Sequence, residues 1–224
     1  MILNTQQIEQ ALADGAIKIS PFDPLKVEAA SIDLKVGPQG ATTSKKKIIN
    51  LESEGFMVLE PGDSGVLLTE EVIELDAKHV ARFGLRSKYA RKGILATTGL
   101  QIDPGFRGRL CIGITNLTPK AITLPYLDDI ISVEFHELAH ETSRPYSGPY
   151  QGKIKLDPSD IDHIISADGF HFAEVLTTLQ ALSQNVGGLS TEMKSLRWLL
   201  LGAIAFLSVL FVIAQVVATV IAAK

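Results

Sequence analysis

The sequence predicts a mainly β domain followed by a long helical tail. Short runs rich in β-branched residues, separated by turn residues, fill most of the first 142 positions. Apolar residues then recur every three or four positions from 172 to 196, and residues 199–223 carry no charge. Many short strands at such spacing are typical of a sandwich or a barrel, whereas the two later patterns are typical of helices.

A helix is expected to open the chain, because Thr5 can cap its start and the apolar residues after it fall on or near one face. These apolar residues are Ile8, Leu12 and Ile17. Turns marked by Pro and Gly at 61–63 and 103–105 then separate β-branched runs. The expected strands are 30–36, 55–59, 64–69, 109–116, 122–124 and 130–135.

The tail is expected to consist of an arm and two helical parts. Residues 143–170 are rich in Pro, Gly, Ser and Asp, which indicates an extended arm and linker. The apolar residues that follow form a heptad seam, which favours an oligomeric stalk; an amphipathic helix lying on the domain or on a membrane surface is the alternative. The seam consists of Phe172, Val175, Leu179, Leu182, Val186, Leu189, Met193 and Leu196. The expected organisation is a globular domain over 1–142, an arm and linker over 143–170, a stalk helix over 171–197 and a membrane helix over 198–224.

The uncharged run at 199–223 is long enough to span a membrane, since about 20 apolar residues cross the hydrocarbon core. Lys194 and Arg197 precede the run and only Lys224 follows it, a bias that favours a cytoplasmic N-terminal domain. The first 15 residues have no basic leader and no continuous apolar region, so no signal peptide is expected. The expected location is therefore that of a single-pass membrane protein with a cytoplasmic domain and a C-terminal anchor.

Charge and cysteine content exclude several classes of protein. The formal net charge of −4 does not favour a nucleic-acid-binding surface. Cys111 is the single cysteine, so an intrachain disulfide and Cys-rich zinc modules are excluded. A reducing compartment agrees with this composition.

One short segment concentrates positive charge. Three cations and a hydroxyl fall within six residues, and such a set suits a polyanion because charge-assisted hydrogen bonds to phosphate are strong. A solvated basic turn is the alternative. The residues are Arg86, Ser87, Lys88 and Arg91.

Residues 136–140 match H-E-x-x-H, the pattern of zinc metalloproteases. That mechanism needs both histidines on one face of a helix, with a third ligand from elsewhere. A strand is expected to run directly into the motif, and Glu134 and Glu141 add charges where the protease pattern has uncharged residues. A protease is therefore not favoured.

Four segments, in this order, resemble the dCTP deaminase branch of the dUTPase superfamily over about residues 1–155. The opening 1–24 with 29–37 is the first, and 85–93 is similar to the phosphate-binding segment of that family. Residues 99–108 are similar to its nucleoside hairpin, and 146–152 resemble the arm that closes over the triphosphate. The resemblance implies a distorted barrel or jelly roll with an N-terminal helix, assembled as a homotrimer with its sites at subunit interfaces.

The resemblance also implies roles for individual residues. Asp103 lies in a turn, where an aspartate is commonly a backbone cap; in the superfamily it faces the deoxyribose, and in dUTPases it orients the attacking water. Asp33 is similar to an early aspartate on the metal side, an indirect contact to Mg²⁺, with a strand-end aspartate as the alternative. The implied phosphate-binding residues are Arg86, Ser87, Lys88, Arg91, Gln101, Tyr146, Tyr150 and Gln151. The implied nucleoside pocket contains Gly99, Ile102, Phe106 and Gly113.

One departure from the family bears on the reaction. Deaminases of this family carry a catalytic glutamate on the strand after the hairpin, and alignment on Gly108 and Asn116 places Gly113 at that position. No Asp or Glu occurs between Asp103 and Asp128, so a shifted alignment supplies no replacement. Deamination needs a group that activates water and protonates the amine, and glycine has none.

The expected function is therefore hydrolysis of dUTP to dUMP and pyrophosphate, with water oriented by Asp103 and with Mg²⁺ on the phosphates. The expected ligand is dUTP or dCTP, and no nucleic acid is expected. A catalytically inactive nucleotide sensor that acts through its membrane helix is the first alternative. A dCTP deaminase that uses an unrecognised acid is the second.

Overall fold

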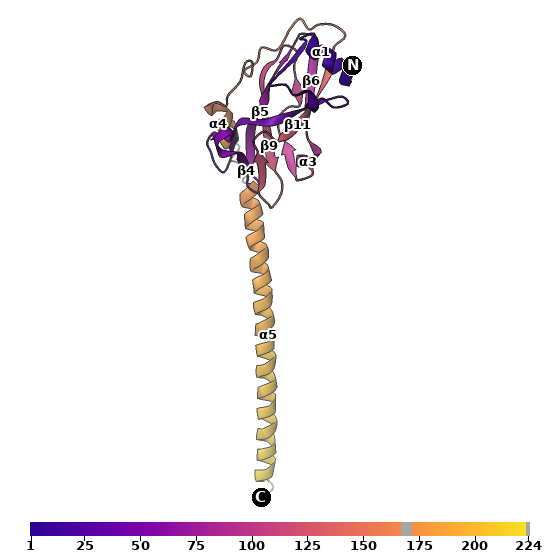
Figure 1. The fold of residues 1–224 in the computed structure, drawn as a ribbon. Helices are drawn as coiled ribbons and strands as arrows, with labels where there is room; N and C mark the ends of the chain where they lie inside the picture. Colours follow the sequence, from indigo (N-terminus) through magenta and orange to yellow (C-terminus); the bar gives the residue numbers. More distant parts are fainter. Residues whose placement is uncertain (167–171, 223–224) are drawn as a thin grey trace. The chain divides into compact units, whose positions relative to one another are not determined.

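The computed structural model describes residues 1–166 and 172–222 and divides into two compact units, Met1–Glu174 and Val175–Lys224. The first unit holds the strands and the second holds most of one long helix (Figure 1).

The first helix, α1 (Thr5–Ala13), begins one residue earlier than the sequence suggests, because Asn4 is its cap rather than Thr5. The Asn4 side chain accepts a hydrogen bond from the Gln7 amide at 3.0 Å, and the Gln7 side chain accepts one from the Asn4 amide at 3.0 Å. This reciprocal pair is a capping box. The Thr5 hydroxyl instead donates to the carbonyl of Glu28 at 3.0 Å, and Ile17 lies in a strand.

The prediction of a mainly β domain is confirmed. Each of the six expected strands occurs, although several are longer than expected. Others, such as β1 and β6, were not predicted, and Ile17, the first residue of β1, was assigned to the opening helix. The strands are β1 (Ile17–Ser20), β2 (Ile32–Thr42), β3 (Ile49–Asn50), β4 (Phe56–Leu59), β5 (Ser64–Leu75), β6 (His79–Leu85), β7 (Ile94–Ala96), β8 (Gln101–Ile102), β9 (Arg107–Asn116), β10 (Ile122–Pro125) and β11 (Asp129–Glu137). Short helices η1 (Pro24–Lys26), α2 (Leu51–Glu54) and α3 (Ser87–Ala90) lie between them.

The strands form a nine-stranded antiparallel sheet with a central order β7-β9-β5-β2-β11-β6-β8, and β10 pairs separately with β4. Irregularities in register occur between β2 and β5 and between β5 and β9, and such bulges bend a sheet. At the first of them Gly37 is required, since a Cβ there would lie 2.3 Å from the Thr69 carbonyl oxygen.

The core follows from alternation along the strands. On β9 the even-numbered residues Leu110, Ile112 and Ile114 are buried, whereas Cys111 and Gly113 between them are half-buried. Because successive side chains of a strand point to opposite faces, one face of β9 packs in the core and the other faces a cavity. Complete burial of one such apolar side chain stabilises the fold by about 1.5–3 kcal/mol.

Residues 143–166, expected as an extended arm and linker, pack against the β domain within the first unit. The Gly152 amide donates to the Arg107 carbonyl at 2.7 Å, and the Arg109 amide donates to the Lys153 carbonyl at 2.8 Å. The segment then forms α4 (Pro158–Ser166). Leu156 and Ile161 are buried in a second apolar cluster that also contains Ala41, Val66 and Leu68. Residues 167–170 of the predicted linker lie outside the described residues.

The second unit contains α5 (Phe172–Ala222), which continues through Gly187 and Gly188 as one helix of 51 residues. Seven residues of the predicted seam, from Val175 to Leu196, are each 54% to 71% exposed in the single chain, and the structure does not support a coiled coil. Among the described residues, no helix combines the length and apolar character that a membrane crossing requires. The prediction of a transmembrane helix is therefore not supported. Residues 223 and 224 of the predicted membrane helix lie outside the described residues. The predicted cellular location stays a prediction.

Candidate functional site

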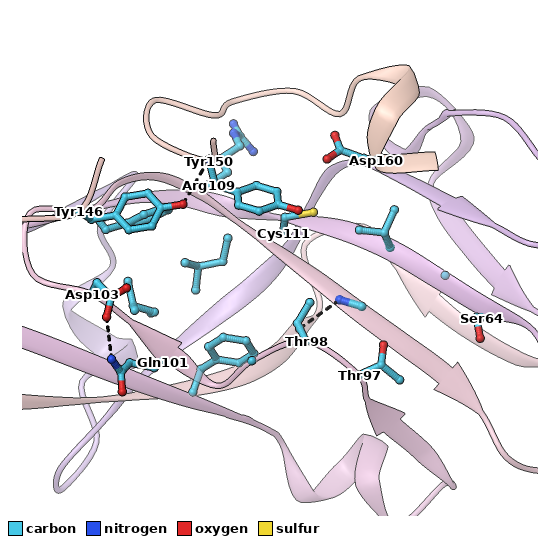
Figure 2. Close-up of a pocket in the computed structure, with 18 residues that line it drawn as sticks. Ser64, Thr97, Thr98, Gln101, Asp103, Arg109, Cys111, Tyr146, Tyr150 and Asp160 are labelled. Atoms are coloured by element: carbon cyan, nitrogen blue, oxygen red, sulfur yellow. Dashed lines mark hydrogen bonds between the residues drawn. The ribbon is translucent and has the colours of Figure 1, made fainter. Parts of the chain in front are cut away.

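A cavity of about 530 Å³ lies against the outward face of β9 (Figure 2). Its volume falls in the range of pockets that hold small organic ligands. Most of its walls come from β9, the segment 97–106 and the segment that contains Tyr146 and Tyr150, and residues 64–66, Phe83 and Asp160 complete them. Eight of the sequence-predicted site residues line it, namely Gly99, Gln101, Ile102, Asp103, Phe106, Gly113, Tyr146 and Tyr150.

Asp103 follows β8 and points its carboxylate along the cavity wall beside Gln101 (Figure 2). The Gln101 side-chain amide donates to Asp103 Oδ1 at 2.6 Å, and the Phe106 amide donates to the Asp103 carbonyl at 3.1 Å. The side-chain partner of Asp103 is thus a neutral amide, which positions the carboxylate without neutralising its negative charge. This is the arrangement expected of a group that accepts a proton or a hydrogen bond from a ligand or water.

Gly113 lies where the tightest packing of the cavity occurs. The Thr97 amide donates to its carbonyl at 2.8 Å, and its own amide donates to Thr98 Oγ1 at 3.2 Å. A Cβ on residue 113 would lie 2.6 Å from Thr97 Oγ1. The Thr97 side chain therefore leaves no room for a glutamate at this position unless it moves.

Several residues of the cavity wall were not predicted as site residues from the sequence, including Ser64, Thr97, Thr98, Arg109, Cys111 and Asp160. The alternation along β9 carried the signal for Arg109 and Cys111, since both share a face with Gly113. Arg109 donates to the Thr69 carbonyl at 2.9 Å and pairs with Glu70 at 3.2 Å. Burial raises the pKa of the Cys111 thiol to about 12, so this thiol is protonated at neutral pH.

The predicted basic segment lies outside the cavity. Arg86 forms an ion pair with the buried Asp33, which also accepts a hydrogen bond from Ser132 Oγ at 2.5 Å. These residues come from β2, from β11 and from the end of β6, which are adjacent in the sheet. Asp33 and Arg86 therefore bind each other across three strands.

The other residues of the segment 86–91 differ in whether a carboxylate pairs with them. Lys88 Nζ lies 2.6 Å from Asp128 Oδ2, and Asp128 also accepts a hydrogen bond from Tyr89. Ser87 begins α3, and its carbonyl accepts a hydrogen bond from the amide of the exposed Arg91 at 3.0 Å. Of the three predicted phosphate-binding cations, Arg91 is the one for which the described residues give no carboxylate partner.

Gln151 and Tyr146 hold the arm in place. The Gln151 side chain donates to the Gly105 carbonyl at 2.9 Å and accepts from the Arg107 amide at 2.9 Å. The ring of Tyr146 packs edge-on against Phe106 with 5.5 Å between centroids. Gln151 thus joins the arm to the backbone of Gly105 and Arg107, whereas Tyr146 contributes to the cavity wall.

The residues present do not fit a Mg²⁺ ion held by the protein. Asp33 is already paired with Arg86, and the described residues contain no group of three or more His, Cys, Asp or Glu side chains that could hold a metal. The H-E-x-x-H motif does not form a helix, since His136 and Glu137 end β11 and bind Glu134 and Lys78. This confirms that the motif lacks the geometry of a zinc protease.

A mainly β domain with a small-molecule cavity along one strand is thus the class that the fold and the site define. Comparison with known proteins gives the family. The model of the dCTP deaminase-like family matches residues 2–138. The chain belongs to this family.

Two curated relatives and one solved structure illustrate the similarity. A dCTP deaminase of Thermococcus sibiricus is 33% identical over 140 residues, which cover 62% of this chain and 88% of the relative. A dUMP-forming dCTP deaminase of Aquifex aeolicus is 28% identical over 171 residues, covering 72% of this chain and 95% of the relative. The crystal structure of 2′-deoxycytidine 5′-triphosphate deaminase from Agrobacterium tumefaciens has a TM-score of 0.52 at 20% identity, covering 62% of this chain and 49% of that one.

The Arg86–Asp33 ion pair is expected to contribute to the free energy of unfolding. Replacing Arg86→Ala leaves a buried carboxylate without its charge partner, and removal of one member of such a pair costs about 3 kcal/mol or more. Urea unfolding of the full chain should show this loss, and the matched change Arg91→Ala on the exposed end of α3 should leave stability within about 0.5 kcal/mol. Equal midpoints for the two variants would contradict the structural role of Arg86.

The packing at Gly113 makes a second prediction. Gly113→Ala should destabilise the domain by about 1–3 kcal/mol, because the added methyl group overlaps Thr97 Oγ1. The double variant Thr97→Ala with Gly113→Ala should recover most of that loss, since the space is returned. Thermal melting of the single and double variants measures the coupling, and strictly additive losses would show that Thr97 is not the obstacle.

Proposed function

We propose that the chain binds a pyrimidine deoxynucleoside triphosphate in the cavity and hydrolyses dUTP to dUMP and pyrophosphate. The observation that carries the proposal is Asp103, a cavity carboxylate whose recorded side-chain partner is the neutral amide of Gln101. Its family membership and the dCTP deaminase names of its relatives support a nucleotide of this class as ligand.

In the proposed reaction, Asp103 accepts a proton from a water molecule as the water attacks a phosphorus of the nucleotide. The new bond joins the water oxygen to that phosphorus, and the bond to the departing pyrophosphate oxygen breaks. A carboxylate fulfils this role when it lies about 2.6–3.2 Å from the water. Mg²⁺ enters as part of the substrate, bound to the phosphate oxygens of the nucleotide.

The phosphates need positive charge that one chain does not bring to its own cavity. Arg109 lines the cavity but is paired with Glu70, and the predicted segment 86–91 lies elsewhere on the domain. We therefore propose a homotrimer in which the Arg91 of one chain reaches the cavity of a neighbour.

Two other functions remain as candidates, each with one observation in its favour. Binding without turnover, as in a sensor, is favoured by the ion pair that already engages Arg109. Deamination of dCTP is favoured by the names of the relatives, whereas the packing of Gly113 against Thr97 argues against it. Tight binding without product would establish the sensor, and release of ammonia from dCTP would establish the deaminase.

Asp103→Asn is expected to lower the rate of dUTP hydrolysis by about 100-fold or more, because an amide cannot take the proton from water. The full chain is incubated with dUTP and Mg²⁺, and dUMP is separated by chromatography. Asp14→Asn, at an exposed position at the end of α1, is the matched control and should retain full activity. Undiminished turnover in the Asp103 variant would remove the proposed mechanism, and absence of turnover in the unaltered chain would remove hydrolysis of dUTP.

The shared site is tested by mixing two inactive variants. If Asp103 of one chain and Arg91 of another act on the same nucleotide, co-expressed Asp103→Asn and Arg91→Ala chains form some sites in which both residues are intact. Such mixtures should recover a measurable part of the activity, whereas each variant alone stays inactive. Mass photometry of the same samples should show three chains per particle, and a monomer or a mixture without recovered activity would contradict the proposal.

A further inference from the structure

Asp160 brings a second carboxylate to the cavity from an element that lies beyond the family match. The match ends at residue 138, whereas Asp160 lies in the first turn of α4. Its side chain lines the cavity with Cys111 and Tyr150, although the residue is only 7% exposed. A carboxylate at this depth needs a charge partner, since unpaired charges are strongly disfavoured in a protein interior.

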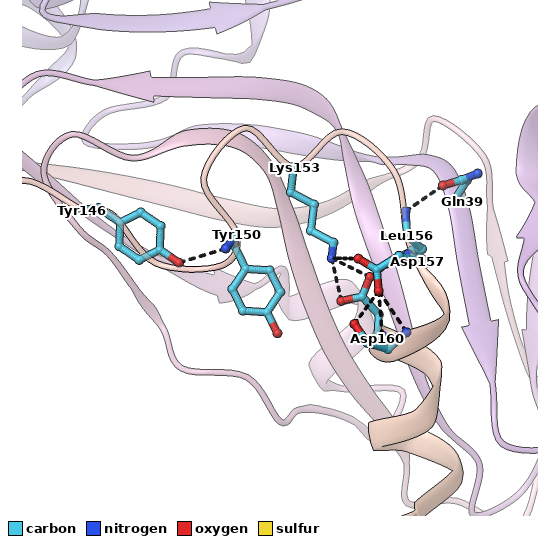
Figure 3. Close-up of polar contacts among 8 residues, drawn as sticks. Gln39, Tyr146, Tyr150, Lys153, Leu156, Asp157 and Asp160 are labelled. Carbon is cyan, nitrogen blue, oxygen red and sulfur yellow. Dashed lines mark hydrogen bonds and ion pairs between the residues drawn. The ribbon is translucent and has the colours of Figure 1, made fainter.

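Lys153 is that partner (Figure 3). Its Nζ atom lies 2.8 Å from Asp160 Oδ1 and 2.6 Å from Oδ2, and it also contacts Asp157 at 2.9 Å. The same ammonium lies 5.2 Å from the centre of the Tyr150 ring. Burial by itself would lower the pKa of Lys153, but the hydrogen bonds to Asp160 and Asp157 raise it above its usual value, so Lys153 is charged at neutral pH.

The backbone of α4 orients the Asp160 carboxylate. Asp160 Oδ2 accepts a hydrogen bond from the Asp157 amide at 2.8 Å, and Asp157 Oδ1 accepts one from the Asp160 amide at 3.3 Å. This reciprocal arrangement is a capping box. Among the residues that the structure describes, Lys153 is the hydrogen-bond donor to Asp160 Oδ1, and because a carboxylate oxygen has two acceptor sites, a second site is left for a ligand.

The position of Asp160 suits the nucleoside and not the phosphates. Figure 2 shows Asp103 and Asp160 on different walls of the cavity, well apart from each other. A carboxylate accepts hydrogen bonds from N–H groups directly, whereas it acts at a phosphate only through a bridging water, the role proposed for Asp103. The exocyclic amine of cytosine and the ring N–H of uracil are such groups, so a base directed toward α4 places the phosphates at the Asp103 end.

We propose that Asp160, positioned by Lys153, contacts the bound nucleotide by accepting an N–H of its pyrimidine base. The proposal rests on the proposed function in one respect, namely that a pyrimidine nucleotide occupies this cavity. It adds a specificity-determining residue from α4. It also links the ligand to α4, since a ligand that contacts Asp160 binds only the state in which α4 is docked.

The chain offers a matched control in Asp157. Asp157 pairs with the same lysine and caps the same helix, but its side chain is 53% exposed and does not line the cavity. Binding of the α,β-imido analogues of dUTP and dCTP to the full chain is measured by calorimetry for Asp160→Asn, Asp157→Asn and Lys153→Met. Thermal melting of each variant verifies that the chain is folded, and Lys153→Arg tests whether a second cation restores the position of Asp160.

Asp160→Asn should weaken binding about tenfold or more, the value of a hydrogen bond to a charged group, whereas Asp157→Asn should change it less than about threefold. Lys153→Met should weaken binding as well, and Lys153→Arg should restore much of it. Equal effects of the changes at 157 and 160 would overturn the assignment, because Asp160 would then act only as a helix cap. That result would leave the proposal of dUTP hydrolysis standing. A selective loss at 160 in a chain that produces no dUMP supports the assignment and removes hydrolysis. Failure of the unaltered chain to bind either analogue would overturn both.

Discussion

The two-residue period of β9 is the constraint on which the site depends. Its even-numbered side chains are buried, and Arg109, Cys111 and Gly113 on the other face border the cavity. One edge of the strand pairs with β5, and the other pairs with β7 at one end and with residues 152–153 at the other. A one-residue shift in this pairing would exchange the two faces, so the packing of the core also positions the cavity wall.

Charge pairing then determines which side chains can act on a ligand. Asp33 is bound by Arg86, and Glu70 by Arg109. In each of these pairs the two charges neutralise each other, and removing one partner would leave the other charge unpaired in a buried or half-buried position. Asp103 differs because a neutral amide holds it, which leaves its charge available to water or ligand.

The cavity departs from the family in a way that the contacts explain. Thr97 Oγ1 lies 2.6 Å from the place that a Cβ on residue 113 would take, so a larger residue there would require Thr97 to move. Residues 146–160 compensate by covering the cavity with Tyr146, Tyr150 and Asp160. The segment that the family match does not include thus supplies a substantial part of the cavity wall.

The sequence by itself determined the mainly β class, the positions of six strands and most of the hairpin from Gly99 to Phe106 that lines the cavity. The class and the strands were predictable because alternation and turn residues act between near neighbours in the chain, whereas the place of the hairpin in the site came from the resemblance to the family. Only the tertiary structure decided that Arg86 and Gln151 are engaged in structural contacts, that residues 143–166 pack against β9, and that Asp160 enters the cavity. The physical reason is that ion pairs and cavity walls depend on distances between segments remote in sequence, and sheet pairing, rather than local propensity, sets those distances.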